Sequence, residues 1–114
     1  MEHTRDERRK HQRVPTQILI QYRSADQFFS DYIQNISRGG IFVPTQQPLP
    51  ENTLLQISFS LPHYDRLITT EGIVVHSVRA DSERADSPAG MGIQFKALSE
   101  ENQQLIDAYV ESLL

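Results

Sequence analysis

The chain has 114 residues, of which 38% are apolar and 23% are charged, and its formal net charge is −4. This length fits one domain with a single core, and the apolar content excludes a wholly disordered chain. The acidic balance argues against a protein that coats nucleic acid through its overall charge, so we expect no DNA or RNA partner. The chain contains no cysteine, which excludes disulfides and thiolate metal sites and is compatible with a reducing compartment.

No apolar run approaches the roughly 20 residues that a membrane-spanning helix needs, and the charged start lacks the apolar region of a signal peptide. We therefore expect a cytoplasmic, soluble protein without membrane insertion.

Residues 1–13 form a basic N-terminal segment without apolar periodicity. We expect a flexible arm here and a folded domain over residues 14–114. In an arbitrary protein such a segment is more often a solvated tail than a binding element. Its cationic residues are Arg5, Arg8, Arg9, Lys10 and Arg13.

The first half of the folded domain has three strand candidates. From Val14, the residues Ile18, Ile20 and Tyr22 alternate with polar neighbours, which predicts a strand with one buried face. Residues 28–36 form the second candidate, which ends at a turn over residues 37–40, where paired glycines permit positive φ. A short third strand over residues 41–43 stops at Pro44.

Three further strand candidates follow a proline-containing loop over residues 45–52. Residues 55–61 show the clearest alternation in the chain, and residues 67–79 form a long strand in which Gly72 marks a candidate bulge. A polar loop over residues 80–88 leads into the last strand, around residues 91–95.

A helix is predicted over residues 99–113. Ser99 is a typical N-cap, and Glu100 and Glu101 follow at the positive end of the helix dipole. The apolar residues then recur at helical spacing, which predicts one buried side made of Leu105, Ile106, Tyr109, Val110 and Leu113. Six strands and one amphipathic helix indicate a mainly β fold, a small six-stranded antiparallel barrel with the C-terminal helix across an open end or seam.

Two short motifs carry the chemistry of the chain. Arg8, Arg9 and Arg13 form the pattern RRxxxR and offer guanidinium forks, whereas Asn35, Ser37 and Gly40 form the pattern NxSxxG at the predicted turn. Arginine pairs with phosphate and with the N7 and O6 edge of guanine, so together the motifs suit an anionic ligand that contains guanine. Alone, the second motif is more often a serine-capped hairpin turn.

In this order and at this spacing, the two motifs resemble those of the PilZ domain, the bacterial receptor module for cyclic di-GMP. The resemblance extends over about residues 8–112, because the strand pattern, the segment Gly90-Met91-Gly92-Ile93-Gln94-Phe95 and the closing helix also follow the family. It implies a split barrel that acts in second-messenger signalling, with outputs such as motility or biofilm regulation.

The resemblance also implies a set of ligand-binding residues. Arginine forks would clamp the ligand, the Asn35 amide and Ser37 hydroxyl would contact a guanine edge and a phosphate, and Gly40 would allow close approach of the backbone. The family accepts Asp or Asn at the first motif position, and Asn35 lacks the carboxylate that could grip guanine N1 and N2. The implied set is Arg8, Arg9, Arg13, Asn35, Ser37 and Gly40, with Lys10, Arg38, Gly39 and His76 as further candidates.

His76 lies where PilZ relatives often present an aromatic residue, and two interpretations are open: an imidazole that stacks on guanine, or a half-exposed strand histidine. The four histidines of the chain show no metal-ligand spacing, so we expect no metal. Neither a nucleophile elbow nor a P-loop occurs, so we expect no enzyme activity and no cofactor besides the ligand.

The leading hypothesis is a cyclic di-GMP receptor whose arginine-rich arm orders on the ligand and signals to an unidentified protein partner. One alternative is a PilZ-like interaction module that does not bind the nucleotide. A third is a small barrel that binds single-stranded nucleic acid, which the acidic net charge disfavours.

Overall fold

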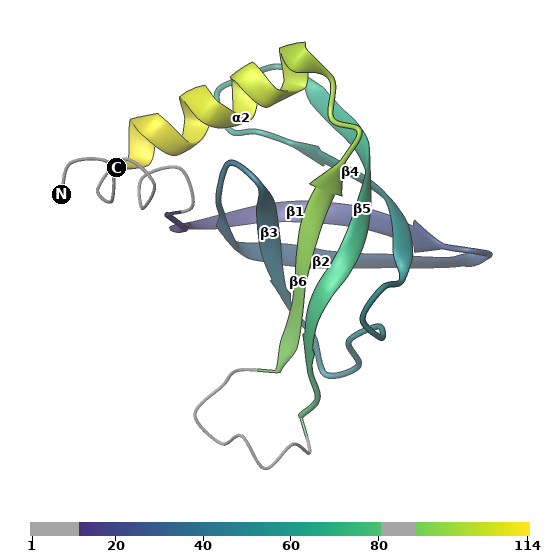
Figure 1. Cartoon of the computed structure of the whole chain (residues 1–114). Helices are drawn as coiled ribbons and strands as arrows, with labels where there is room; N and C mark the ends of the chain where they lie inside the picture. Colours follow the sequence, from purple (N-terminus) through teal and green to yellow (C-terminus); the bar gives the residue numbers. More distant parts are fainter. Residues whose placement is uncertain (1–11, 81–88) are drawn as a thin grey trace, which may run out of the picture.

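The computed structural model describes residues 12–80 and 89–114. Six strands and one helix lie in these ranges (Figure 1). Their bounds are β1 Val14–Ser24, β2 Gln27–Ile36, β3 Gly40–Pro44, β4 Leu54–Ser60, β5 Leu67–Val78, β6 Gly90–Lys96 and α2 Glu100–Leu113.

The strands close into a barrel in the order β1-β2-β3-β6-β5-β4. Every neighbouring pair is antiparallel, and the ring closes where β1 pairs with β4, with Ile20 opposite Phe59. The predicted six-stranded antiparallel barrel is confirmed, and closure gives each strand a hydrogen-bonded neighbour on both sides.

One hydrophobic core fills the barrel, because alternate residues of each strand point inward. In β4, for example, Leu55, Ile57 and Phe59 are buried while Gln56 between them is exposed. Burial of one such side chain favours folding by about 1.5–3 kcal/mol. The fully buried members of the core include Ile20, Ile33, Ile36, Ile41, Val43, Ile57, Ile68, Val74, Met91, Ile93, Ile106 and Val110.

Strand β1 contains a bulge near its start, where it pairs with the end of β2. The register shifts between Pro15, which faces Asn35, and Ile18, which faces Ile33, so that two residues of β1 oppose one of β2. Such a bulge bends the strand and changes which residues face inward. It explains how Ile33 and Ile36 are both fully buried although three positions separate them, and it leaves Asn35 on the outer side.

The second irregularity corrects the prediction for Gly72. In the β5–β6 pair the register shifts between Val74 and His76, whereas Gly72 stays in regular register. Gly72 serves packing instead, because a Cβ there would lie 2.7 Å from the Cγ2 of Ile93. A bulge needs an extra residue, which need not be a glycine. The bulge that was predicted at Gly72 therefore lies at Val75.

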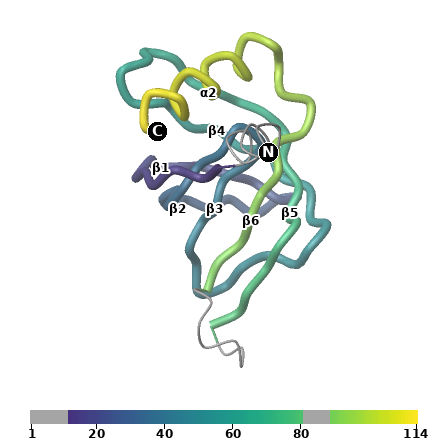
Figure 2. Tube along the Cα trace, turned by 60° about the vertical axis from the view of Figure 1, so that its left-hand side comes forward, coloured from purple at the N-terminus to yellow at the C-terminus, as the bar shows by residue number. Residues whose placement is uncertain are grey.

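Helix α2 crosses one end of the barrel (Figures 1 and 2). Its predicted cap is confirmed, since the Ser99 hydroxyl accepts a hydrogen bond from the backbone N of Asn102 at 3.1 Å. Tyr109 is buried and shares a hydrogen bond of 2.6 Å with the hydroxyl of Thr16 on β1. Leu113, predicted on the buried side, is 45% exposed at the end of the helix. No helix in the described ranges has the length and apolar character to span a membrane.

Candidate functional site

The turn between β2 and β3 is closed by the hydroxyl of Ser37. This oxygen accepts hydrogen bonds from the backbone N of Gly39 at 3.3 Å and of Gly40 at 3.2 Å. The backbone N of Ser37 in turn donates to the carbonyl oxygen of Gly40 at 2.8 Å. Ser37 is only 6% exposed. Its hydroxyl therefore first holds the shape of the turn, which is the serine-cap role that the motif also suggests on its own.

The two glycines of the turn have different surroundings. A Cβ on Gly40 would overlap the backbone carbonyl oxygen of Ile93 in β6, whereas no described atom lies within 4 Å of a Cβ on Gly39. Gly40 therefore lets the backbone of β3 lie close to that of β6, and its role toward a ligand stays a prediction. The turn does not use the positive φ that glycines permit, because neither Gly39 nor Gly40 is among the glycines with positive φ. The pair is not needed for a left-handed turn.

Arg13 and Asn35 lie together at the adjoining end of β1 and β2. Val14 faces Ile36 in the register, so the residue before β1 lies beside the end of β2. Nη1 of Arg13 donates to Oδ1 of Asn35 at 3.0 Å. Desolvation by neighbouring atoms lowers the pKa of Arg13 from its ordinary value, but an arginine in a protein stays charged at neutral pH. A cation and an amide thus stand side by side next to the Ser37 turn.

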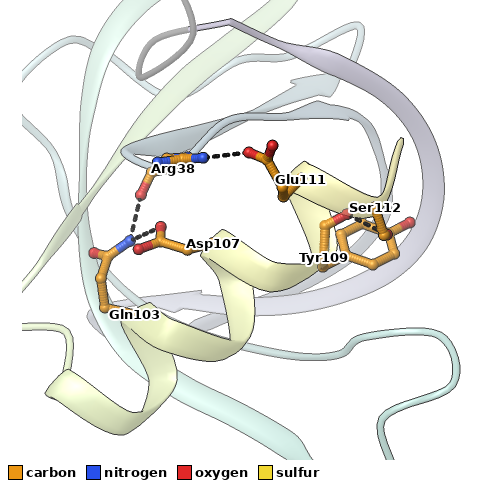
Figure 3. Close-up of polar contacts among 6 residues, drawn as sticks. All are labelled: Arg38, Gln103, Asp107, Tyr109, Glu111 and Ser112. Atoms are coloured by element: carbon orange, nitrogen blue, oxygen red, sulfur yellow. Dashed lines mark hydrogen bonds and ion pairs between the residues drawn. The ribbon is translucent and has the colours of Figure 1, made fainter. Parts of the chain in front are cut away.

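Helix α2 forms the other border of this region (Figure 3). Nη2 of Arg38 lies 2.6 Å from Oε2 of Glu111. Nε2 of Gln103 donates to the backbone oxygen of Arg38 at 2.9 Å and also to Oδ1 of Asp107 at 2.8 Å. The middle of the turn is therefore tied to the helix through both its main chain and its side chain.

His76 lies on the same cross-strand row as Asn35. Asn35 faces Phe42 on β3, Phe42 faces Gly92 on β6, and Gly92 faces His76 on β5. Three strand spacings separate the ends of the row by about 14 Å along the barrel wall. Gly92 brings no side chain into the row, and His76 is exposed. A Cβ on Gly92 would lie 3.4 Å from the Cβ of His76, so a larger residue at this position would lie against His76.

The comparison with protein families identifies the chain. Residues 7–112 match the model of the PilZ domain. The chain belongs to the PilZ domain family. No curated protein sequence is significantly similar to it.

Solved structures share the PilZ fold at low sequence identity. The inhibitor of motility MotI/DgrA of Bacillus subtilis superposes with a TM-score of 0.76 at 21% identity, over 92% of this chain and 50% of that one. The PilZ domain of YcgR from Escherichia coli, solved with cyclic di-GMP, gives 0.70 at 13% identity over 93% of this chain and 91% of that one. MrkH, described as a cyclic di-GMP dependent transcription regulatory factor, gives 0.68 at 23% identity over 93% and 51%. The chain spans about half the length of MotI/DgrA and of MrkH.

Within this PilZ domain, the described members of the predicted ligand set apart from His76 lie around the turn between β2 and β3. Arg13 touches Asn35, and Arg38 and Gly39 lie in the turn that Ser37 and Gly40 close. Arg8, Arg9 and Lys10 lie outside the described residues, so their role stays a prediction.

Sequence reasoning missed the contribution of α2 to this region. Glu111 is 73 positions away from Arg38 in the chain, and an exposed glutamate near a helix end carries no local signal. Phe42 and Gly92 were missed as neighbours of the site for the same reason: only the strand pairing places them between Asn35 and His76.

Proposed function

We propose that this PilZ domain is a receptor for cyclic di-GMP and not an enzyme. The observation that carries the proposal is the contact between Arg13 and Asn35, at 3.0 Å, which joins one residue from each ligand-binding motif of the family. Two PilZ proteins with the same fold, the YcgR domain and PlzA of Borreliella burgdorferi, were solved with cyclic di-GMP. These structures support the ligand class for this chain.

The ligand presents two phosphates and two guanines, and the site offers partners for both. Arg13 would pair with a phosphate through two parallel N–H donors, together with Arg8 and Arg9 of the arm. Asn35 would then be released from Arg13, and its amide would donate to and accept from a guanine edge. His76 would supply a ring on which the second guanine stacks.

Ligand binding would also order the arginine-rich arm over the site. Charge-assisted hydrogen bonds to the phosphates would offset the conformational entropy that residues 8–13 lose. The ordered arm and the nearby surface of α2 would then present a changed surface to a protein partner. We infer a bacterial signalling role in the cytoplasm, with motility or biofilm formation as the output.

Calorimetric titration with cyclic di-GMP tests the receptor function. We expect saturable binding by the wild-type chain and a loss of affinity of about tenfold or more in Arg9→Ala and in Arg13→Ala, the cost of one charged hydrogen-bonding group. Arg23→Ala is the matched control, because Arg23 lies over the ring of Phe28 at 5.9 Å on another part of β1. Absence of binding up to high micromolar nucleotide, or equal affinity of Arg13→Ala and Arg23→Ala, would refute the proposal.

Arm ordering needs its own measurement. Backbone amide resonances of residues 8–13 should shift and gain protection from exchange at saturating nucleotide. If the resonances stay unchanged while the nucleotide binds saturably, the proposed ordering of the arm is wrong and only the receptor function stands.

One observation favours a second candidate, an interaction module that works without nucleotide. Leu19 and Tyr32 face each other across β1 and β2, and they are 50% and 55% exposed. Aromatic residues in an uncharged setting are typical of protein interfaces. The same titration separates the two functions, because a pure interaction module would bind a partner protein and give no heat with cyclic di-GMP.

A further inference from the structure

The side chain of Arg38, in the middle of the NxSxxG turn, forms an ion pair with a residue of helix α2. Its guanidinium pairs with the carboxylate of Glu111 through Nη2 and Oε2 at 2.6 Å (Figure 3). A carboxylate and a phosphate bind arginine in the same way, through anionic oxygens that accept from the guanidinium fork. Glu111 therefore binds the same guanidinium that an anionic ligand at this turn would bind.

This hold is weak for two reasons. The two side chains are 30% and 48% exposed, and water and salt screen an ion pair of this kind so that it shifts an equilibrium by about fivefold at most. In addition, Nε of Arg38 is buried and has no hydrogen-bond partner among residues 12–80 and 89–114. An unpaired buried donor is unfavourable, so the position of Arg38 on Glu111 leaves one of its hydrogen bonds unmade.

A phosphate of the ligand would correct this deficit. When Arg38 turns away from Glu111 and its Nε becomes accessible, two phosphate oxygens can accept from Nε and from an Nη at the same time, whereas in the present pair a single carboxylate oxygen contacts Nη2. Arg38 would then exchange Glu111 for the ligand. The exchange does not require α2 to leave the barrel, because other contacts hold the helix: Gln103 donates to the backbone oxygen of Arg38, and Ile106 and Val110 are buried in the core.

We propose that Glu111 is an intramolecular competitor of the ligand phosphate at Arg38, and that it lowers the affinity of the domain for cyclic di-GMP. The inference rests on the proposed receptor function and deepens it. It assigns to α2 a part in setting the ligand concentration at which the receptor responds.

The test compares Glu111→Gln with Glu101→Gln. Both glutamates lie on α2 and both pair with an arginine, since Glu101 contacts Arg66, so each variant removes a negative charge and weakens an ion pair with an arginine. Only Glu111 contacts the turn. By calorimetric titration we expect Glu111→Gln to bind cyclic di-GMP about two- to fivefold more tightly than the wild type and Glu101→Gln to bind like it.

A double-mutant cycle decides whether Glu111 acts through Arg38. Arg38→Gln should weaken binding, and adding Glu111→Gln to it should restore nothing, because the contested group is gone. A gain that persists in the Arg38→Gln background would overturn the proposal, as would equal affinities of Glu111→Gln and Glu101→Gln. If the wild type binds and Glu111→Gln shows no gain, only this inference fails; if neither binds, the receptor function fails with it.

Discussion

Nη1 of Arg13 donates to Oδ1 of Asn35 at 3.0 Å, so the cation beside β1 is already engaged by the amide at the end of β2. The contact is exposed, and an exposed hydrogen bond of this kind contributes little to the stability of the fold. It does position both groups. A ligand that draws Arg13 to a phosphate would free the Asn35 amide at the same moment, so the two contacts with the ligand would form together.

Asn35→Asp should raise the affinity for cyclic di-GMP by about three- to tenfold. A carboxylate can accept from both N1–H and the 2-amino group of guanine, and hydrogen bonds to charged groups are stronger by about 1 kcal/mol than neutral ones. Adenine has neither of these donors, so affinity for cyclic di-AMP should not rise. Parallel calorimetric titrations with the two nucleotides measure this. Equal changes for both would mean that residue 35 does not contact the base.

Gly40→Ala should destabilise the barrel by roughly 2–4 kcal/mol, because the new Cβ overlaps the backbone of Ile93 and a strand must move. Gly39→Ala is the matched control: it lies next in the same turn, has open space around it in the described part of the chain, and should change stability by less than about 0.5 kcal/mol. Urea unfolding of both variants checks this. Similar midpoints would show that the turn can relax away from β6.

The hydrogen bond between Thr16 and Tyr109 links α2 to the barrel, and its loss should cost about 1 kcal/mol. Tyr109→Phe leaves the Thr16 hydroxyl without this partner, so it should be less stable than the wild type. The double variant Thr16→Val with Tyr109→Phe removes both polar groups and should recover most of the loss. Thermal or urea unfolding of the set tests this, and a double variant less stable than Tyr109→Phe would contradict it.

Tyr22 should make the stability of the domain depend on alkaline pH. Its hydroxyl donates to Oδ2 of Asp31 at 2.7 Å, and burial, followed by this hydrogen bond and the charge of Asp31, raises the pKa of Tyr22 well above its ordinary value. The unfolded tyrosine ionises near pH 10 while the folded one stays neutral. The stabilisation is therefore complete below about pH 10 and falls above it by up to about 1.4 kcal/mol per pH unit.

Unfolding in urea at pH 7 to 11 measures this dependence. Tyr22→Phe should be less stable than the wild type at pH 7, and the difference should narrow above pH 10. Tyr32→Phe removes a hydroxyl from an exposed residue of β2 and serves as the control. A difference between wild type and Tyr22→Phe that stays constant to pH 11 would contradict the role of Asp31.

The strands and the helix could be predicted because their buried residues recur at regular intervals in the sequence. Leu55, Ile57 and Phe59 alternate with polar residues in β4, and Ser99 caps α2 as expected. The bulge in β5 could not be placed, because the extra residue, Val75, is chemically ordinary and Gly72 looked more suitable.

The site was predictable only as far as its motifs reach. Asn35, Ser37 and Gly40 are close in the chain, so their spacing describes a turn. Contacts between residues far apart in the chain have no local sequence pattern. Position 40 needs a glycine because the backbone of Ile93 lies close to it, and Arg38 pairs with Glu111 on the helix. These pairs exist because the barrel closes and α2 crosses its end, which no local pattern specifies.

Closure of the barrel also restricts how another protein can recognise this one. Each of the six strands has a paired neighbour on both flanks, in places over only part of its length, so an extended segment of a partner finds fewer free main-chain donors and acceptors than at an open sheet edge. Recognition therefore depends largely on exposed side chains and on the helix. Such a surface can acquire a new specificity by a few outward-facing replacements while the interior that supports the candidate site stays the same.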